Sequence, residues 1–138
     1  MVENDPTPDG WAKEAQRYAE SALALRKLMP RQAYSMAGLG VECAIKSLIM
    51  RRNGLNRWPG RSERGDLYVH NFEQLLRIAG LLQDVEAEIR YVTEVGVAWV
   101  VAKEFSMASR YPDKPLSAPM VDDMVDAAER LVAWLLMM

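Results

Sequence analysis

Apolar residues recur every three or four positions along most of the chain, which is the period of one face of an α-helix. Clusters of proline and glycine separate the stretches that carry this pattern. These stretches predict helices over about 11–25, 31–52, 71–80, 84–110 and from 119 onward. No stretch makes a convincing strand. The pattern therefore predicts an all-α fold: an antiparallel up-and-down bundle of five helices, three or four of them long.

The second predicted helix is apolar on most of its sides, so we expect it at the centre of the bundle. One of its faces carries only small side chains, at Ala33, Ala37, Gly40, Ala44 and Ser47. Small side chains let another backbone approach closely, and we expect this approach within the bundle. Glu42 and Lys46 interrupt the apolar pattern. Since they are four residues apart, they share a face and are predicted to form a partly buried ion pair.

The connection 53–69 is longer than usual for two helices of a bundle. Residues 51–64, which cover the helix end and most of this Arg-rich loop, hold five arginines but a single acid, Glu63; the arginines are Arg51, Arg52, Arg57, Arg61 and Arg64. A guanidinium grips phosphate in a planar fork and stacks on bases, and we expect Trp58 to offer an exposed stacking face beside it. The loop is thus a candidate for binding an anionic ligand or an acidic partner, and a merely solvated loop is the alternative.

Composition limits the possible classes of site. The chain has 138 residues, of which 50% are hydrophobic and 26% charged, so it fits one globular domain. The single cysteine, Cys43, excludes an internal disulfide framework. The single histidine, His70, excludes any site that needs two imidazoles from one chain. We therefore expect no metal site and no cofactor. The net charge of −2 favours no class of partner.

The first ten residues contain three acids, two prolines and no basic residue. We expect residues 1–10 to form a flexible acidic N-terminus and residues 11–138 to form one domain. The N-terminus lacks the basic and apolar regions of a signal peptide. No apolar stretch approaches the roughly 18 residues of a membrane span. The expected location is therefore cytoplasmic, without membrane contact.

His70 is the candidate acid–base residue, because histidine gains and loses a proton near neutral pH. RNA cleavage without a metal needs a base for the 2′-hydroxyl and a cation for the phosphate, and here only His70 with an arginine supplies both. Contact with a ligand and capping of the following helix are the alternatives for His70. Arg110 and Tyr111 follow at the end of the fourth predicted helix. There a guanidinium either complements the helix dipole or holds a phosphate.

Three segments together resemble the HEPN family (higher eukaryotes and prokaryotes nucleotide-binding domain). AYSMAGLGVECAIKSLI (33–49) is similar to the second helix of that family, which reads small–small–E–x–x–(I/L)–K. YVHNFEQLLRIAGL (68–81) resembles its third helix, which is led by H–x–(L/F)–x–x–L–L. SMASRYPD (106–113) resembles the Arg–Tyr–Pro that closes its long fourth helix, with an aromatic such as Trp99 upstream. The resemblance extends over about 11–134.

The resemblance implies a small helical bundle, usually a homodimer, that binds nucleotide or RNA. Many members are encoded beside a minimal nucleotidyltransferase as toxin–antitoxin pairs, and others are metal-independent RNases. The RNase members carry an Arg, four to six residues and a His near the junction of two late helices. Here no histidine follows Arg110, and Arg64 and His70 are the one pair with that spacing, before the third predicted helix. Whether the chain is an enzyme therefore stays open.

We therefore expect a HEPN-like domain that binds nucleotide or RNA phosphate in a cleft of the bundle. The candidate binding residues are Glu42, Lys46, His70, Arg110, Tyr111, Arg51, Arg52 and Arg64. Two alternatives remain open at this point. One is a metal-independent RNase that uses His70 with Arg64 or Arg110. The other is a non-catalytic helical module for interaction or dimerisation.

Overall fold

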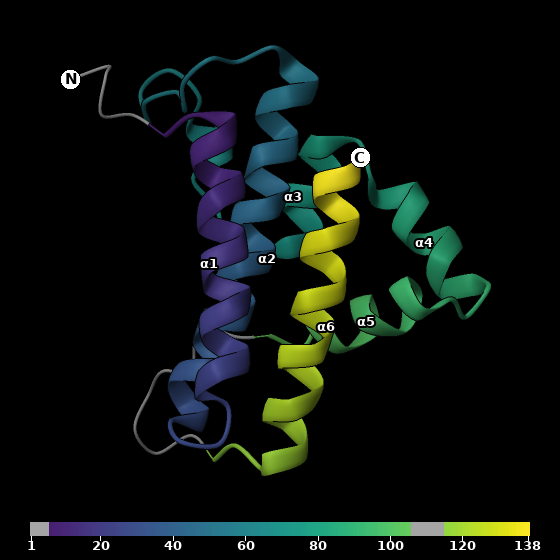
Figure 1. Cartoon of the computed structure of the whole chain (residues 1–138). Helices are drawn as coiled ribbons and strands as arrows, with labels where there is room; N and C mark the ends of the chain where they lie inside the picture. Colours follow the sequence, from purple (N-terminus) through teal and green to yellow (C-terminus); the bar gives the residue numbers. More distant parts are fainter. Residues whose placement is uncertain (1–5, 106–114) are drawn as a thin grey trace.

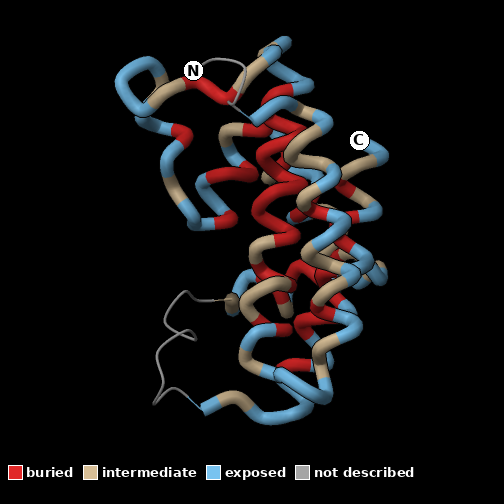
Figure 2. Tube along the Cα trace, turned by 60° about the vertical axis from the view of Figure 1, so that its left-hand side comes forward, coloured by how far each residue is buried: buried red, intermediate tan, exposed pale blue. Residues whose placement is uncertain are grey.

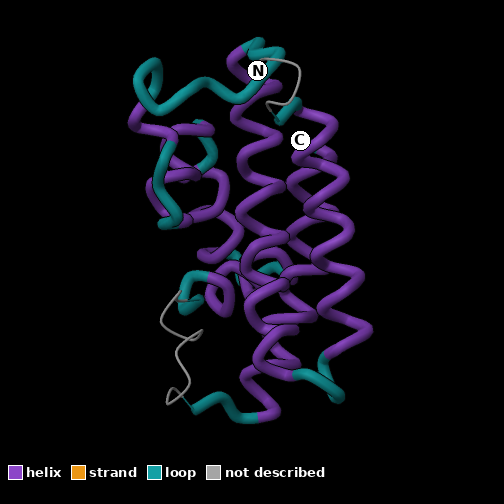
Figure 3. Tube along the Cα trace, turned by 90° about the vertical axis from the view of Figure 1, so that its left-hand side faces the viewer, coloured by secondary structure: helices purple, strands orange, loops and turns teal. Residues whose placement is uncertain are grey.

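The computed structural model describes residues 6–105 and 115–138, and Arg110 and Tyr111 lie outside them. The described residues contain helices and loops but no strand (Figure 3). This confirms the all-α prediction. The α-helices are α1 Pro8–Leu25, α2 Pro30–Asn53, α3 Phe72–Ala79, α4 Leu82–Arg90, α5 Glu94–Ala102 and α6 Ala118–Met137, and a short 3-10 helix, η2, spans Gly65–Leu67 (Figure 1).

Three long helices, α1, α2 and α6, lie side by side (Figure 1). α1 and α2 are antiparallel, whereas α2 and α6 run in the same direction. The ends of α2 and α6 meet, since the Arg51 guanidinium donates a hydrogen bond of 3.1 Å to the carbonyl of Leu135. The predicted up-and-down order is therefore wrong for the last helix. Three shorter helices, α3, α4 and α5, come between α2 and α6 in the sequence, so the long helices do not simply alternate in direction.

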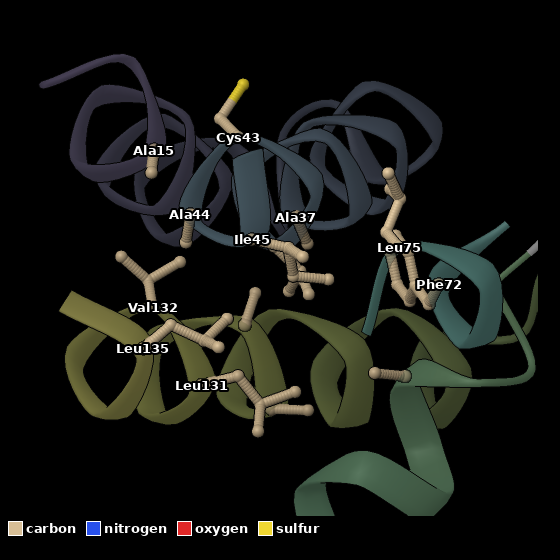
Figure 4. Close-up of a cluster of buried hydrophobic side chains, with 14 of the residues drawn as sticks. Ala15, Ala37, Cys43, Ala44, Ile45, Phe72, Leu75, Leu131, Val132 and Leu135 are labelled. Atoms are coloured by element: carbon tan, nitrogen blue, oxygen red, sulfur yellow. The ribbon is translucent and has the colours of Figure 1, made fainter. Parts of the chain in front are cut away.

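α2 is the central helix, as its pattern predicted. Every residue from 40 to 50 is buried, and the tube is almost continuously red along this part of the chain (Figure 2). Figure 4 shows how α2 meets its neighbours: Ala44 and Ile45 face Val132 and Leu135 of α6. Leu75 of α3 closes one side of the same cluster. Removing this apolar surface from water is the main driving force for the fold.

The small face of α2 receives α1, which confirms the predicted close approach. A Cβ at Gly40 would lie 3.2 Å from the carbonyl oxygen of Ala15 and 3.3 Å from the Cβ of Tyr18. Ala15 and Ala22 on α1 are completely buried. At the end of this seam the Ser47 hydroxyl donates to the carbonyl of Pro8 at 2.9 Å. The seam therefore fixes the start of α1 against α2.

α1 begins earlier than the sequence suggested. Pro8 occupies its first turn, and the Thr7 hydroxyl accepts a hydrogen bond of 3.0 Å from the backbone N–H of Gly10. Thr7 is therefore the N-cap, a position that favours a side-chain oxygen. The boundary expected between residues 10 and 11 is wrong, because residues 8–10 belong to the helix.

The single long helix predicted over 84–110 is also wrong, because α4 and α5 are separate. The chain turns at 91–93, where Val92 has a positive φ of 54° and the Thr93 hydroxyl caps α5 by accepting from the N–H of Gly96 at 3.0 Å. The two helices then pack against each other, and a Cβ at Gly96 would lie 2.1 Å from the carbonyl oxygen of Glu88. The apolar period continues through the turn, so periodicity alone could not reveal the break.

Among the described residues, no helix has both the length and the apolar character needed to cross a bilayer.

Gly96→Ala tests the crossing of α4 and α5. The added methyl group would overlap the backbone of Glu88, which cannot rotate away as a side chain can. We expect the free energy of unfolding to fall by at least about 2 kcal/mol in urea titrations. Gly65→Ala is the matched control, since a Cβ there meets no atom within 4 Å. Equal stabilities of the two variants would contradict the crossing.

Candidate functional site

The candidate site is built around an ion pair inside the central helix. Glu42 and Lys46 are only 5% and 8% exposed. The Lys46 ammonium donates a hydrogen bond of 2.8 Å to Oε2 of Glu42. The predicted buried pair is thus confirmed. Because desolvated charges are unfavourable without a partner, each of these residues depends on the other.

Two tryptophan rings complete the surroundings of Lys46. Its ammonium lies 5.0 Å from the ring centre of Trp11 and 5.5 Å from that of Trp58. The rings touch edge to face, with centres 5.5 Å apart. Each presents an attractive face to a cation, which replaces part of the hydration that Lys46 loses. We call Trp11, Glu42, Lys46, Trp58 and His70 the Glu42 cluster.

The expectation that Trp58 is exposed is wrong. Its side chain is buried against Lys46 and Trp11. The backbone N–H of Trp58 donates to the carbonyl of Pro6 at 2.7 Å, so the Arg-rich loop folds back over the start of the chain. No local pattern indicates this contact, because it joins segments about fifty residues apart.

His70 is the exposed member of the cluster. Its Nδ1 lies 3.1 Å from both carboxylate oxygens of Glu42, while its side chain is 63% exposed. A carboxylate only accepts hydrogen bonds, and that of Glu42 already accepts one from the Lys46 ammonium. Nδ1 must therefore carry the hydrogen. In the neutral ring, Nε2 is then left with a free lone pair on the other edge of the imidazole.

The residues after His70 fix its position. The Asn71 side chain accepts a hydrogen bond of 3.0 Å from the N–H of Gln74 and so caps α3. Phe72 and Leu75 anchor this short helix in the core. His70 therefore precedes a capped and anchored helix rather than a loose loop. Such support holds a functional side chain in one orientation.

Two of the predicted phosphate ligands bind helix ends instead. The Arg51 guanidinium reaches the carbonyl of Leu135 in the last turn of α6. Arg52 donates to the carbonyls of Ala79 at 3.0 Å and Gly80 at 3.4 Å, at the end of α3. The last carbonyls of a helix have no partner within it, so these contacts stabilise the bundle.

Arg64 is held by a carboxylate two positions further along the chain. Its Nε and Nη2 donate to the two oxygens of Asp66 at 2.9 and 2.8 Å. These hydrogen bonds lower the pKa of Asp66 and raise the pKa of Arg64. Of the candidate ligands, the structure thus brings together Glu42, Lys46 and His70, and gives Arg51, Arg52 and Arg64 other partners.

Other residues of the Arg-rich loop were not predicted as binding residues. Glu63 accepts from the N–H of Gly60 at 3.1 Å and from Arg57 at 3.5 Å, and these contacts lower its pKa. The Arg61 guanidinium lies 5.1 Å from the ring centre of Tyr68. Tyr68 could not be predicted as a binding residue, because one tyrosine in a loop forms no recognisable motif in a single sequence. Trp11 was passed over because its spacing marked it only as a helix-face residue.

A metal site and covalent catalysis by cysteine find less support in the structure. In the part of the chain that the structure describes, no three or more His, Cys, Asp or Glu residues are grouped to hold a metal ion. Cys43 is buried beside Glu42, and burial, reinforced by that carboxylate, raises the pKa of its thiol to about 12. Since the thiolate is the nucleophile, Cys43 is unsuited to covalent catalysis near neutral pH.

The chain matches no family model, no curated protein and no solved structure. Its function is therefore inferred from the geometry above.

Lys46→Met tests the buried pair. It leaves the Glu42 carboxylate buried with only an exposed histidine as partner, so we expect the free energy of unfolding at pH 7 to fall by about 3–5 kcal/mol. The double variant Glu42→Gln/Lys46→Met removes both charges and should regain a large part of that loss. Denaturant titrations of the two single variants and the double variant give the coupling. A Lys46→Met protein as stable as the wild type would show that the pair is not buried.

Cys43 gives an independent test of burial at the same turn of α2. Because its thiol stays protonated well above neutral pH, iodoacetamide should not label it in the folded protein at pH 8. Labelling should become complete once denaturant unfolds the chain. Rapid labelling under native conditions, followed by mass spectrometry, would contradict the packing of α2.

Proposed function

We propose that this chain is a HEPN-like domain that binds the phosphate of a nucleotide or of RNA, with His70 as its contact residue. The observation that carries the proposal is the orientation of His70. Glu42 holds one edge of the ring and leaves the other edge exposed. When protonated, that edge donates a charge-assisted hydrogen bond of the kind that phosphate oxygens accept.

The charges around His70 support an anionic ligand. The loop that leads to His70 carries Arg57, Arg61 and Arg64 within eight positions, and Glu63 and Asp66 offset two of these charges. A concentration of arginines raises the local concentration of polyanions and speeds their association. The loop is therefore suited to attract the ligand that His70 contacts.

Lys46 and Glu42 have a different role in this proposal from the one the sequence suggested. Lys46 is enclosed by two tryptophans and bound to Glu42, so no phosphate can reach it without disrupting the cluster. Glu42 faces His70 and Lys46. We therefore assign both to positioning: Lys46 compensates the buried carboxylate, and the carboxylate orients the imidazole.

The family resemblance supports the same proposal. Its second-helix motif contains Glu42 and Lys46, and its third-helix motif begins at His70. These motifs are far apart in the sequence, yet their polar residues are in contact. Within the proposal the chain acts in the cytoplasm as a homodimer. A minimal nucleotidyltransferase is its proposed partner, in a pair of the toxin–antitoxin type.

A metal-independent RNase is the second candidate, favoured by one further feature of His70. A buried carboxylate that fixes the Nδ1–H tautomer leaves Nε2 as a general base. In RNA cleavage Nε2 would remove the 2′-hydroxyl proton, and the 2′-oxygen would bond to phosphorus as the bond from phosphorus to the 5′-oxygen breaks. The 5′-oxygen would take up a proton from water. The products are a cyclic phosphate and a 5′-hydroxyl end, and no metal is needed.

Calorimetric titration at ~50 mM salt with a short RNA, ATP and GTP tests phosphate binding. We expect at least one of these ligands to bind, with an affinity that falls as salt is added. His70→Ala should weaken this affinity at least about tenfold, because it removes a charge-assisted hydrogen bond. Gln16→Ala, an exposed position on α1, is the control and should bind as the wild type does. Absence of binding to folded wild-type protein would refute the proposal and favour an interaction module.

The RNase candidate is tested separately by incubating structured RNA with the protein in EDTA. Cleavage that disappears in an identically purified His70→Ala protein would establish His70 as the base. Intact RNA under the same conditions would reject catalysis while leaving phosphate binding in place.

A further inference from the structure

We infer that Arg61 and Tyr68 form a stacking platform that receives one unpaired base beside the phosphate contact at His70. The inference rests on the proposed function and adds a second binding position and a class of ligand. That class is nucleotides and single-stranded nucleic acid, as opposed to duplexes and phosphates that carry no base.

Tyr68 is held in place but accessible. Its hydroxyl donates a hydrogen bond of 2.7 Å to the carbonyl of Pro59, which fixes the end of the ring. The residue is nevertheless 38% exposed. An aromatic ring that is already ordered loses little conformational freedom when a base stacks on it. Base–aromatic stacking accepts any base, because every base has a planar face.

Arg61 extends this surface. Its guanidinium lies over the Tyr68 ring at 5.1 Å, and the residue is exposed. A guanidinium stacks through its plane and donates hydrogen bonds through its edge. Contact with the tyrosine ring therefore leaves the N–H edge of Arg61 oriented for an anion, and a base can continue the stack.

Arg61 also differs from the other arginines of this region. Arg57 pairs with Glu63, and Arg64 is held by both oxygens of Asp66. Within the described part of the chain, Arg61 has no carboxylate partner. It is thus the loop arginine whose contacts leave most of its donors for a ligand.

The platform lies close to His70. The two residues Tyr68 and His70 are separated by one position, so their Cα atoms are at most about 7 Å apart. Both side chains are held by segments that meet in the Glu42 cluster: Tyr68 donates to the carbonyl of Pro59, the neighbour of Trp58, and His70 bonds Glu42. A short chain of contacts through Lys46 joins the two.

Stacking on this platform requires a base that is free of a double helix. In a duplex the bases are paired and stacked on each other, so single strands and free nucleotides are the ligands that splay a base onto an aromatic ring. A base-free polyphosphate would reach His70 and Arg61 but gain nothing from Tyr68. The contribution of Tyr68 therefore distinguishes the ligand classes.

The experiment compares Tyr68 variants on three ligands at one salt concentration: a single-stranded RNA hexamer, the same hexamer paired with its complement, and tripolyphosphate. Tyr68→Leu should weaken binding of the single strand by about fivefold to a hundredfold. It should leave tripolyphosphate unchanged. Tyr68→Phe keeps the ring and should retain most of the affinity. Tyr91→Leu, at the exposed turn between α4 and α5, is the matched control and should match the wild type.

The outcomes separate this inference from the function on which it rests. If Tyr68→Leu binds the single strand as tightly as the wild type, or loses affinity equally for all three ligands, the platform is refuted and the phosphate site at His70 stands. If none of the ligands binds folded wild-type protein, both fail. Circular dichroism and thermal melts establish that each variant is folded.

Discussion

A buried carboxylate with two hydrogen-bond donors is the constraint on which this structure depends. Glu42 lies in the helix that is buried most completely, where an unpaired charge would be strongly destabilising. Lys46 supplies the compensating charge from the same helix, and His70 supplies a second donor from another part of the chain. Lys46 in turn loses water and recovers attraction from Trp11 and Trp58. Burial of Glu42 thus requires Lys46 as a partner, and burial of Lys46 requires the two tryptophan rings.

This constraint explains why distant segments meet at one turn of α2. Pro6 accepts from the backbone of Trp58, and Pro8 accepts from Ser47, so the start of α1 and the Arg-rich loop are fastened together over the cluster. The cap at Asn71 sets where α3 begins and thereby where His70 stands. Glu42, Lys46 and Trp58 are buried, Trp11 is partly buried, and the imidazole is the exposed side chain of the cluster. The buried members of the cluster thus stabilise the fold, and the exposed His70 carries the proposed binding.

Features that follow from local periodicity could be predicted from the sequence. The all-apolar sides of α2 predicted its central place, and its small face predicted the approach of α1 at Gly40. The spacing of Glu42 and Lys46 predicted their pairing. Features decided by tertiary contacts could not be predicted. The burial of Trp58 depends on the carbonyl of Pro6 near the start of the chain, and the capping role of Arg52 depends on where α3 ends.

The imidazole of His70 offers the most direct test, because it is the only histidine in the chain and its nitrogen signals need no assignment. A long-range ¹H–¹⁵N correlation spectrum, recorded above the pH at which the ring loses its proton, reports which nitrogen carries the hydrogen. We predict the Nδ1–H form in the wild type and a shift toward the Nε2–H form in Glu42→Gln. A wild-type spectrum of the Nε2–H form, unchanged by Glu42→Gln, would show that Glu42 does not hold His70 and would contradict the site.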